Sequence, residues 1–223
     1  MTDEGHMDWV ILHGLKPAQA EELLALGRKR HFARREVVWH EGDRADTLHF
    51  IRSGRIAIQS LTALGEVATV AVLGPGEAAG LIAVHATDPY HTTGAVALEP
   101  TETHAIRVDT LSEFRRRSPA VDDALVRFLA DRTLDLTIQL VDAMYVPAET
   151  RVLRRLAALL ALYDNGDSEV VIPLTQEDLA GLAGVTRPTV NRVLKKEEQR
   201  GTLRLSRGTI TIMDRGRLAA RTS

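Results

Sequence analysis

The stretch that decides the fold is Pro173–Gln199, PLTQEDLAGLAGVTRPTVNRVLKKEEQ. It predicts two short helices joined by a tight turn, because apolar residues recur with helical spacing on both sides of Gly184. Glycine readily adopts the left-handed backbone that a sharp turn needs. Pro188 suits the first turn of the second helix, where an amide proton would have no partner. With Ala180 and Val190, these residues have the spacing of a helix-turn-helix.

The outward side of the second helix is polar and basic. Its residues are Arg187, Thr189, Asn191, Arg192, Lys195 and Lys196. Such side chains suit phosphate oxygens and guanine edges, although a helical hairpin with a solvated basic face would show the same pattern. Residues 203–213, LRLSRGTITIM, favour DNA binding, because they predict two short strands turning at Arg207-Gly208, the wing of a winged helix.

Composition bounds the class of protein. A chain of 223 residues with 44% hydrophobic and 26% charged residues is typical of a soluble globular protein of one or two domains. No apolar run approaches the roughly 20 residues of a membrane span, and no secretory signal is recognisable. The absence of cysteine excludes disulfides, thiolate iron–sulfur clusters and cysteine nucleophiles. We therefore expect a cytoplasmic protein without membrane contact.

The charge is unevenly distributed along the chain. Residues 148–223 hold 13 Lys and Arg against 9 Asp and Glu, a net charge of +4. Because the whole chain carries −2, the remainder carries −6. A basic C-terminal part on an acidic body is expected where one end meets nucleic acid.

The N-terminal half reads first as helix and then as many short strands. Residues 8–30 include a predicted helix with Pro17 in its first turn. From residue 34 to 107, β-branched runs alternate with turn signals, which predicts an antiparallel β-roll and an α+β fold class. The expected strands are 37–39, 48–51, 55–59, 67–73 and a continuation from 96 to 108.

A long helix is predicted from about residue 121 to 145. A seam with alternating spacing of four and three residues indicates a heptad pattern, in the positions Leu125, Leu129, Arg132, Leu136, Gln139 and Ala143. We expect it to pair two subunits, with a helix buried inside one domain as the alternative. Pro147 ends this helix as a hinge before a further helix at 151–163 and a strand at 170–172. The expected domains are 1–118 (β-roll sensor), 119–146 (dimerisation helix) and 147–223 (winged helix-turn-helix).

In this order of elements the chain resembles the cyclic AMP receptor protein and fumarate–nitrate regulator family of bacterial transcription factors. The resemblance runs from about Leu15 to Met213. Its carriers are the segments EGD at 41–43, LHFIRSGRI at 48–56, GEAAG at 76–80, LTQEDLA at 174–180 and TRPTVNRVL at 186–194. It implies a homodimer without enzymatic activity that binds double-stranded DNA at a palindromic operator, and it leaves RNA polymerase open as a further partner.

The resemblance also implies roles on the DNA side. The family reads bases through an Arg, a following Glu and an Arg five residues after the first; these positions hold Arg187, Pro188 and Arg192 here. Because proline cannot accept a hydrogen bond from cytosine, we expect an operator that differs at that base pair. The positions that bind phosphate in the family are Thr175, Gln176, Thr189 and Lys195.

The effector pocket departs further from the family pattern. Members that bind cyclic AMP have Gly-Glu-Leu followed by Arg-Ser or Arg-Thr, in which the Glu holds the ribose and the Arg the cyclic phosphate. The corresponding residues here are Gly80, Leu81 and Ile82, then His91 and Thr92, and the base-contacting positions of the long helix fall at Leu136 and Thr137. Leucine cannot hydrogen-bond a ribose, and losing a charged phosphate contact is costly. We expect no tight cyclic AMP binding in the family's mode; another small-molecule effector, or none, stays open.

Other classes of site have weaker support. All eight histidines lie between His6 and His104, and His40, His49, His85, His91 and His104 lie on or near the roll. None has a standard metal-ligand spacing, so we interpret them as scattered surface residues without a metal site, and a haem-sensing regulator stays an open alternative. A cupin-like metalloenzyme lacks clustered His and Glu ligands. A cyclic-nucleotide module of a kinase or channel lacks its partner domain, and Arg115-Arg116-Arg117 indicates a solvated loop or helix end.

Overall fold

The computed structural model divides the chain into two compact units, which are described separately below. The described residues are 9–61, 67–82 and 87–222. The first unit comprises residues 1–60 with 71–136, and the second comprises residues 61–70 with 137–223. The histidines His6 and His85 named above lie outside the described residues.

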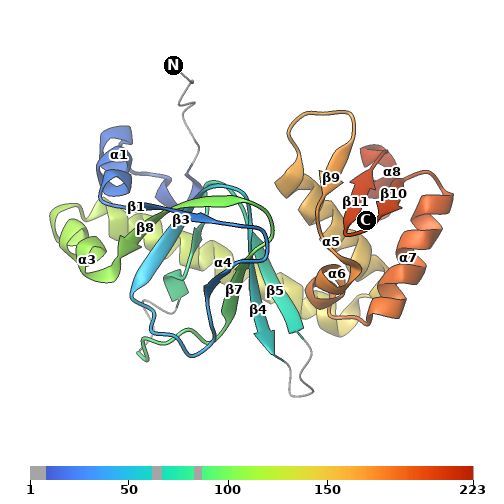
Figure 1. Ribbon diagram of the computed structural model, residues 1–223, viewed down its shortest axis with the longest axis horizontal. Helices are drawn as coiled ribbons and strands as arrows, with labels where there is room; N and C mark the ends of the chain where they lie inside the picture. Colours follow the sequence, from blue (N-terminus) through green and yellow to red (C-terminus); the bar gives the residue numbers. More distant parts are fainter. Residues whose placement is uncertain (1–8, 62–66, 83–86, 223) are drawn as a thin grey trace. The chain divides into compact units, whose positions relative to one another are not determined.

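Two four-stranded sheets form the β-roll (Figure 1). One has the strand order β1-β8-β3-β6, made of Arg28–Phe32, Thr101–Arg107, Thr47–Ser53 and Ala78–Ala79. The other has the order β2-β7-β4-β5, made of Val37–Trp39, Gly94–Ala97, Ile56–Leu61 and Val67–Leu73. The recorded strand registers are antiparallel. The predicted antiparallel roll is therefore confirmed.

The sequence pattern missed the first strand of the roll, β1, and the two-residue strand β6. The helix expected within residues 8–30 is α1 (Pro17–Ala25), preceded by the short 3-10 helix η1 (Val10–Leu12), and Pro17 lies in its first turn as predicted. The chain is already extended from Arg28, where β1 begins. Phe32 is the buried residue of this edge strand and the other four are exposed, so the alternation that indicates a strand is absent.

Strand β3 lies between two hydrophobic cores, because its side chains alternate between the faces of the sheet. Leu48 and Phe50 point into a core that also receives the helices, whereas Ile51 points between the two sheets. The core between the sheets contains Trp39, Ile51, Ile56, Ala71, Leu73, Ala79 and Ala95. The core under the helices contains Leu23 of α1, Ile106 of β8, Leu111 and Phe114, with Val121 and Leu125.

Helix α3 (Val108–Arg117) follows β8 directly and was not predicted. Its buried side consists of Leu111 and Phe114, with Val108 partly buried on the same core, which is a short pattern in ten residues. The run Arg115-Arg116-Arg117 forms its last turn, where positive charge is favourable next to the negative end of the helix dipole. The interpretation of this run as a helix end is confirmed.

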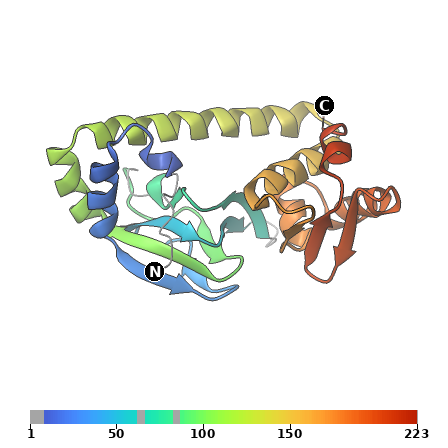
Figure 2. The same ribbon diagram turned by 90° about the horizontal axis from the view of Figure 1, so that it is seen from above.

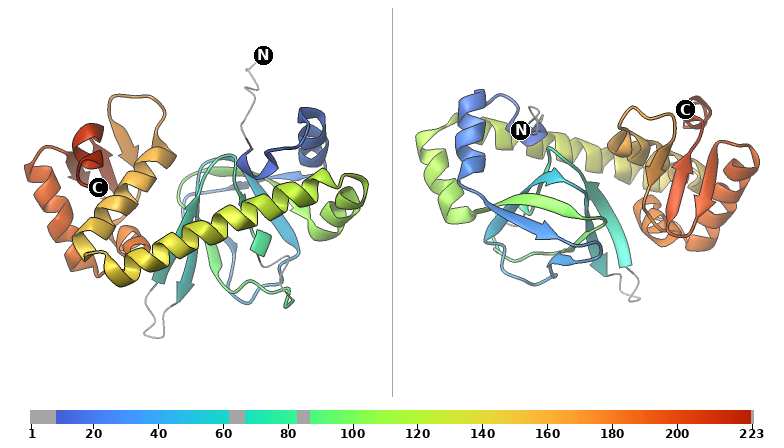
Figure 3. Two further views of the ribbon diagram at one scale, coloured as in Figure 1. Left: turned by 180° about the vertical axis from the view of Figure 1, so that it is seen from behind. Right: turned by 45° about the horizontal axis from the view of Figure 1, so that its top comes forward.

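Helix α4 (Ala120–Tyr145) is continuous over 26 residues, as predicted (Figure 2). Its first turns pack on the roll through Val121, Ala124 and Leu125, with Phe128 and Leu129 partly buried beside them (Figure 3). The later turns are exposed even where they are apolar. No helix among the described residues is long and apolar enough to span a membrane.

The second unit is a helical domain with a small sheet. Its helices are α5 (Ala148–Tyr163), α6 (Gln176–Ala183), α7 (Arg187–Gln199) and α8 (Arg215–Ala219). Its antiparallel sheet has the order β10-β11-β9, made of Leu203–Ser206, Thr209–Ile212 and Val170–Ile172 (Figure 3). The core is formed by one apolar side of each element, among them Leu153, Leu156, Ile172, Leu179, Val190, Leu194, Ile210 and Leu218. Pro147 precedes α5 as its N-cap, so the predicted break between α4 and α5 is confirmed.

Candidate DNA-binding and effector sites

Capping residues define both ends of α6, the first helix of the helix-turn-helix. Thr175 caps α6: its hydroxyl accepts from the Asp178 amide at 3.1 Å, and Asp178 Oδ2 accepts from the Thr175 amide at 3.0 Å. This reciprocal pair satisfies two amides that the first turn leaves without partners. Gly184 ends α6 with φ of +58°, the left-handed conformation expected from the sequence. Gly184 thereby begins the tight turn that joins α6 to α7.

The second helix of the motif, α7, buries one side and exposes the other. Val190, Val193 and Leu194 are buried, and Pro188 occupies the first turn. The outward residues are Arg187, Pro188, Asn191, Arg192, Lys195 and Lys196, all exposed, with Thr189 intermediate. Helix α7 therefore presents a basic side to solvent. A helix that enters a major groove requires such an exposed side.

Three of the four basic side chains on α7 already have acidic partners. Lys195 Nζ lies 2.8 Å from Glu198 Oε2, and Arg187 Nε lies 3.9 Å from Glu177 Oε2. Both pairs are exposed, so DNA phosphates can replace the carboxylates at small cost. Among the described residues no ion pair is recorded for Arg192, which leaves its guanidinium available.

Lys196 is exposed on the basic face to which the sequence assigned it, and it also pairs with another helix. Its ammonium lies 2.8 Å from Glu149 Oε1 at the start of α5, so it holds two helices together. The sequence pattern gave no sign of this pairing, because Glu149 lies 47 residues away in the chain.

Three of the polar residues that the resemblance assigns to phosphates lie at the N-terminal ends of the two helices, Thr175 and Gln176 at the start of α6 and Thr189 in the first turn of α7. Gln176 Oε1 accepts from Asn191 Nδ2 at 3.0 Å, and the Thr189 hydroxyl lies 3.1 Å from that of Thr186. The Thr175 hydroxyl also donates to Asp178 Oδ2 at 2.7 Å. These side chains are therefore ordered within the protein before any ligand is bound.

The predicted wing is present. Strands β10 and β11 pair from Leu203 with Ile212 to Ser206 with Thr209, and the turn lies at Arg207-Gly208. Gly208 has φ of +73°, which explains a glycine at this position. Arg204 on β10 is paired with Glu169 at 2.9 Å, while Arg207 is exposed at the tip.

The effector-pocket positions in the roll are built around Gly80, which has φ of +93°. A Cβ at this glycine would lie 3.1 Å from the Thr47 carbonyl oxygen and 3.6 Å from His91 Cε1, so the backbone approaches its neighbours closely. Leu81 is buried, with 2% exposure, in the core beneath the helices. Its side chain therefore contributes to packing at the position where the family pattern has a ribose-binding carboxylate.

His91 fills space at the position of the phosphate-binding arginine. Its ring stacks on Trp39 with centroids 4.3 Å apart and planes 14° apart. The Trp39 indole nitrogen donates to the Thr93 carbonyl oxygen at 2.9 Å, which holds the stack in place. Burial lowers the pKa of His91, although Asp43 and Asp46 oppose this. An uncharged ring in this place offers no fixed positive charge to a phosphate.

His49 and His91 correct the interpretation of the histidines as surface residues, because both are buried. His49 lies on β3 with its ring 5.9 Å from Trp39 and its Nδ1 3.1 Å from the Thr103 hydroxyl. Burial, with Arg30 and His91 nearby, lowers the pKa of His49 to about 4. Strand alternation with buried Ile51 was the available signal. In the described part of the chain, no three His, Asp or Glu side chains are grouped as a metal site.

Two of the cavities bordered by described residues lie in the first unit. One of about 250 Å³ is bounded by Trp39, His49 and His91, with charged residues at its edge. The other, of about 260 Å³, lies between Glu77 and the α4 residues Arg132 and Asp135, and burial raises the pKa of Glu77.

Of the expected pocket residues, His91 lines the first of these cavities, whereas Thr92, Leu136 and Thr137 are exposed. The structure thus brings Gly80 and His91 together.

Comparison with known proteins supports both halves of this description. Residues 29–118 match the cyclic nucleotide-binding domain, and residues 151–221 match the Crp-like helix-turn-helix domain. The cyclic AMP receptor protein of Thermus thermophilus is 29% identical over 204 residues, covering 92% of each chain. A CRP-like cAMP-activated global transcriptional regulator of Mycobacterium tuberculosis is 28% identical over 214 residues, covering 95% of each chain.

Solved structures show the same architecture. FixK2 from Bradyrhizobium japonicum has a TM-score of 0.77 at 19% identity, covering 88% of this chain and 98% of that one. The catabolite activator protein of Thermus thermophilus has a TM-score of 0.55 at 28% identity, covering 95% and 97%. The chain belongs to the cyclic AMP receptor protein and fumarate–nitrate regulator (CRP/FNR) family of transcription regulators.

Proposed function

We propose that the protein is a homodimeric, sequence-specific regulator that binds a palindromic operator and is not controlled by cyclic AMP in the family's usual mode. The observation that carries the DNA-binding part is the exposed basic side of α7 with the adjoining wing. We assign residues 1–118 to a sensor domain, 119–146 to the dimerisation helix and 147–223 to the DNA-binding domain. The protein acts by binding, with no catalytic step.

The exposed apolar surface of α4 supports the dimer. Eight large apolar side chains on α4 are exposed: Val126, Leu134, Leu136, Ile138, Leu140, Val141, Met144 and Tyr145. Exposed apolar side chains concentrated on one helix favour burial against a second helix. Three of the eight, Val126, Leu140 and Met144, lie on one heptad row with alternating spacing of four and three, together with the small residues Ala130, Thr133 and Thr137.

We place the dimer contact on this row, one residue away from the seam expected from the sequence. Leu125 of that seam is buried on the roll and Leu129 packs beside it, so the start of the seam faces its own domain. The row through Val126 and Leu140 is offset by one residue and faces outward, with these side chains 65% and 61% exposed. Two copies paired along it would present two α7 helices to successive major grooves about 34 Å apart.

On the DNA, we assign base reading to Arg187 and Arg192, the two arginines of α7. Each is exposed and can form a bidentate contact to guanine. Thr175, Gln176, Thr189 and Lys195 are assigned to phosphates, where they set the register without reading sequence. Pro188 removes the acceptor that would read cytosine, so the operator should differ at that base pair.

For the effector, the relatives named above point to cyclic AMP and the pocket of this chain points away from it. The ribose position is the buried Leu81, and the phosphate position is His91, stacked on Trp39. Neither supplies the charged or hydrogen-bonding group that an anion needs when it leaves water. The cavity beside Trp39 and His91 offers space for another ligand.

Selection of binding sites from random duplex DNA tests the proposal directly. We expect a twofold-symmetric site whose half-sites differ from the family's at the base pair opposite Pro188. Titration calorimetry with cyclic AMP and cyclic GMP forms the second arm, and we expect no binding at micromolar concentration. If the selection enriched no sequence, the proposal of a sequence-specific regulator would be refuted. Micromolar binding of cyclic AMP would refute only the proposal that cyclic AMP is not the effector.

A further inference from the structure

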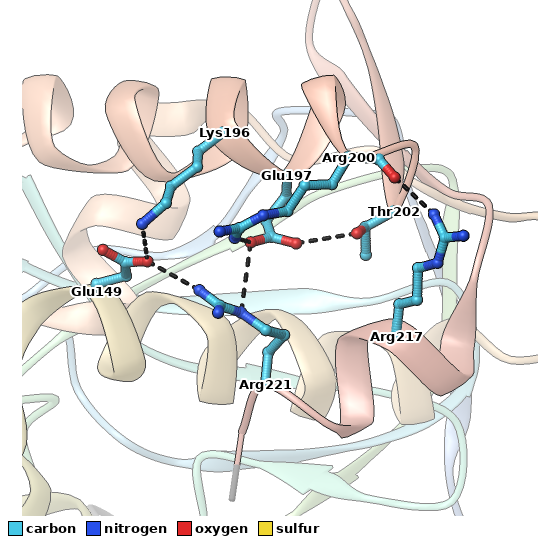
Figure 4. Close-up of polar contacts among 7 residues, drawn as sticks. All are labelled: Glu149, Lys196, Glu197, Arg200, Thr202, Arg217 and Arg221. Carbon is cyan, nitrogen blue, oxygen red and sulfur yellow. Dashed lines mark hydrogen bonds and ion pairs between the residues drawn. The ribbon is translucent and has the colours of Figure 1, made fainter.

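Glu197 is a buried carboxylate on the recognition helix α7 that has no counterpart in the DNA-contact scheme above. Its side chain is 1% exposed and points away from the outward face. Arg200 Nη1 lies 2.6 Å and the Thr202 hydroxyl 2.9 Å from its oxygens, and Arg221 Nε lies 3.6 Å away (Figure 4). A carboxylate is stable at such a depth only when it is paired and hydrogen-bonded.

Arg221 connects this carboxylate to a second helix. Its Nη2 lies 3.0 Å from Oε1 of Glu149, in the first turn of α5 (Figure 4). The same Glu149 oxygen accepts from Lys196, the residue before Glu197, at 2.8 Å. One guanidinium, two carboxylates and one ammonium therefore tie α5 and α7 to the segment that follows α8.

That segment is itself attached to the end of α7 and to the wing. Arg217 of α8 donates to the Arg200 carbonyl oxygen at 2.6 Å, and Asp214 caps α8 by accepting from the Arg217 amide at 2.9 Å. The Thr202 carbonyl oxygen accepts from the amides of Met213 and Asp214 at 3.0 and 3.1 Å. The position of Arg221 is thus fixed relative to the helix that it holds.

We propose that Arg221, bridging Glu149 and Glu197, is a positioning residue that sets the orientation of the recognition helix for reading DNA. The geometry needed to read base edges is stricter than that needed to meet phosphates, because bidentate contacts require the helix at one depth and angle. Loss of the bridge should therefore lower affinity for the operator and leave affinity for unrelated DNA nearly unchanged. This inference rests on the proposed DNA-binding function.

The chain supplies a matched control pair. Arg215, the first residue of α8, lies 2.6 Å from Asp164, and their side chains are 36% and 34% exposed. Arg221 and Glu149 are both 38% exposed. The control pair joins α8 to the turn after α5 and does not touch α7. Arg215→Met and Asp164→Asn therefore change net charge as Arg221→Met and Glu149→Gln do, without loosening the recognition helix.

The experiment measures dissociation constants of the full-length protein for its selected operator and for a scrambled duplex. We expect Arg221→Met to weaken operator binding about fivefold or more, with less than about a twofold change on scrambled DNA. Glu149→Gln gives the sharper result. Removing a negative charge should strengthen DNA binding by electrostatics alone, whereas loss of positioning weakens operator binding. The control variants should leave the ratio of the two constants unchanged.

Equal weakening on both duplexes by Arg221→Met would mean a direct phosphate contact and would overturn the inference, as would no effect on either. Amide hydrogen exchange gives a readout that needs no DNA: Arg221→Met should speed exchange in α7 by about tenfold more than Arg215→Met. If the wild-type protein failed to distinguish operator from scrambled DNA, the proposed function would fail. The exchange result alone would then decide whether the bridge holds α7.

Discussion

Arg151 offers the most direct test of how the DNA-binding unit is held together. Its guanidinium donates to the Ala183 and Gly184 carbonyl oxygens at the end of α6, both at 3.0 Å. It also donates to the Val146 and Ala143 carbonyl oxygens at the end of α4, at 3.0 and 3.2 Å. A single side chain thus serves two helix C-termini, where carbonyl groups lack helical partners and negative charge accumulates.

The expected effect of Arg151→Met follows from these four bonds. Two are partly buried and two are exposed. At about 1 kcal/mol for each partly buried bond and about 0.5 kcal/mol for each exposed one, the loss is about 3 kcal/mol. Methionine keeps most of the apolar stem, so packing changes little. Arg151→Lys should recover only part of the loss, because an ammonium cannot span both helix ends.

Amide hydrogen exchange measured by mass spectrometry can place this loss in the chain. A difference of about 3 kcal/mol corresponds to about a 100-fold faster exchange in the most protected amides of α5, α6 and α7. Tryptophan fluorescence during urea unfolding gives a second probe, because Trp9 and Trp39 both belong to the first unit. The urea concentration at the midpoint of this tryptophan transition should not change in Arg151→Met. Arg207→Met, at the tip of the wing, is the control for lost charge.

Exchange in α6 and α7 that stayed within about twofold of wild type would refute the reasoning, since the guanidinium would then carry no stabilising role. A parallel shift of the tryptophan transition would also count against it. In that case the substitution would have destabilised the whole chain through a route other than the two helix ends.

Three further predictions concern DNA reading, assembly and pH. Arg192→Ala should weaken operator binding by about 1–3 kcal/mol and relax one base position, while Lys195→Ala should weaken all sequences alike, as band-shift titrations would resolve; identical behaviour of the two would contradict the assigned roles. Leu140→Glu should shift the mass measured by sedimentation from dimer to monomer, whereas Ile138→Glu, at a position 53% exposed but off the outward row, should not; a dimer that survives both rejects that row. The pKa of His49 is 6.5 in the unfolded chain and about 4 in the folded protein. The contribution of the neutral ring to the free energy of unfolding is therefore fully present above pH 6.5, and it falls by about 3 kcal/mol as the pH drops towards 4. His49→Asn should flatten that slope in urea titrations at several pH values, and an unchanged slope would exclude the histidine as its source.

Local sequence patterns determined most of the helices and strands of this protein and much of the DNA-binding surface. Gly184, Pro188 and the turn at Arg207-Gly208 each impose a backbone conformation through their own covalent structure, so the helix-turn-helix and wing could be predicted without a structure. The exposed Arg192 followed from helical period alone.

The tertiary structure decided which side of each element met which neighbour. Leu125 and Val126 are adjacent in α4, yet one is buried on the roll and the other is 65% exposed. His49 has the sequence context of a surface histidine, but its strand lies between two hydrophobic cores, and the pairing of Lys196 with Glu149 depends on the packing of α5 beside α7. Edge strand β1 carried no alternation, because four of its five residues are exposed. Periodicity reports that a face is apolar or charged, but partner, burial and pKa depend on contacts between residues far apart in the chain.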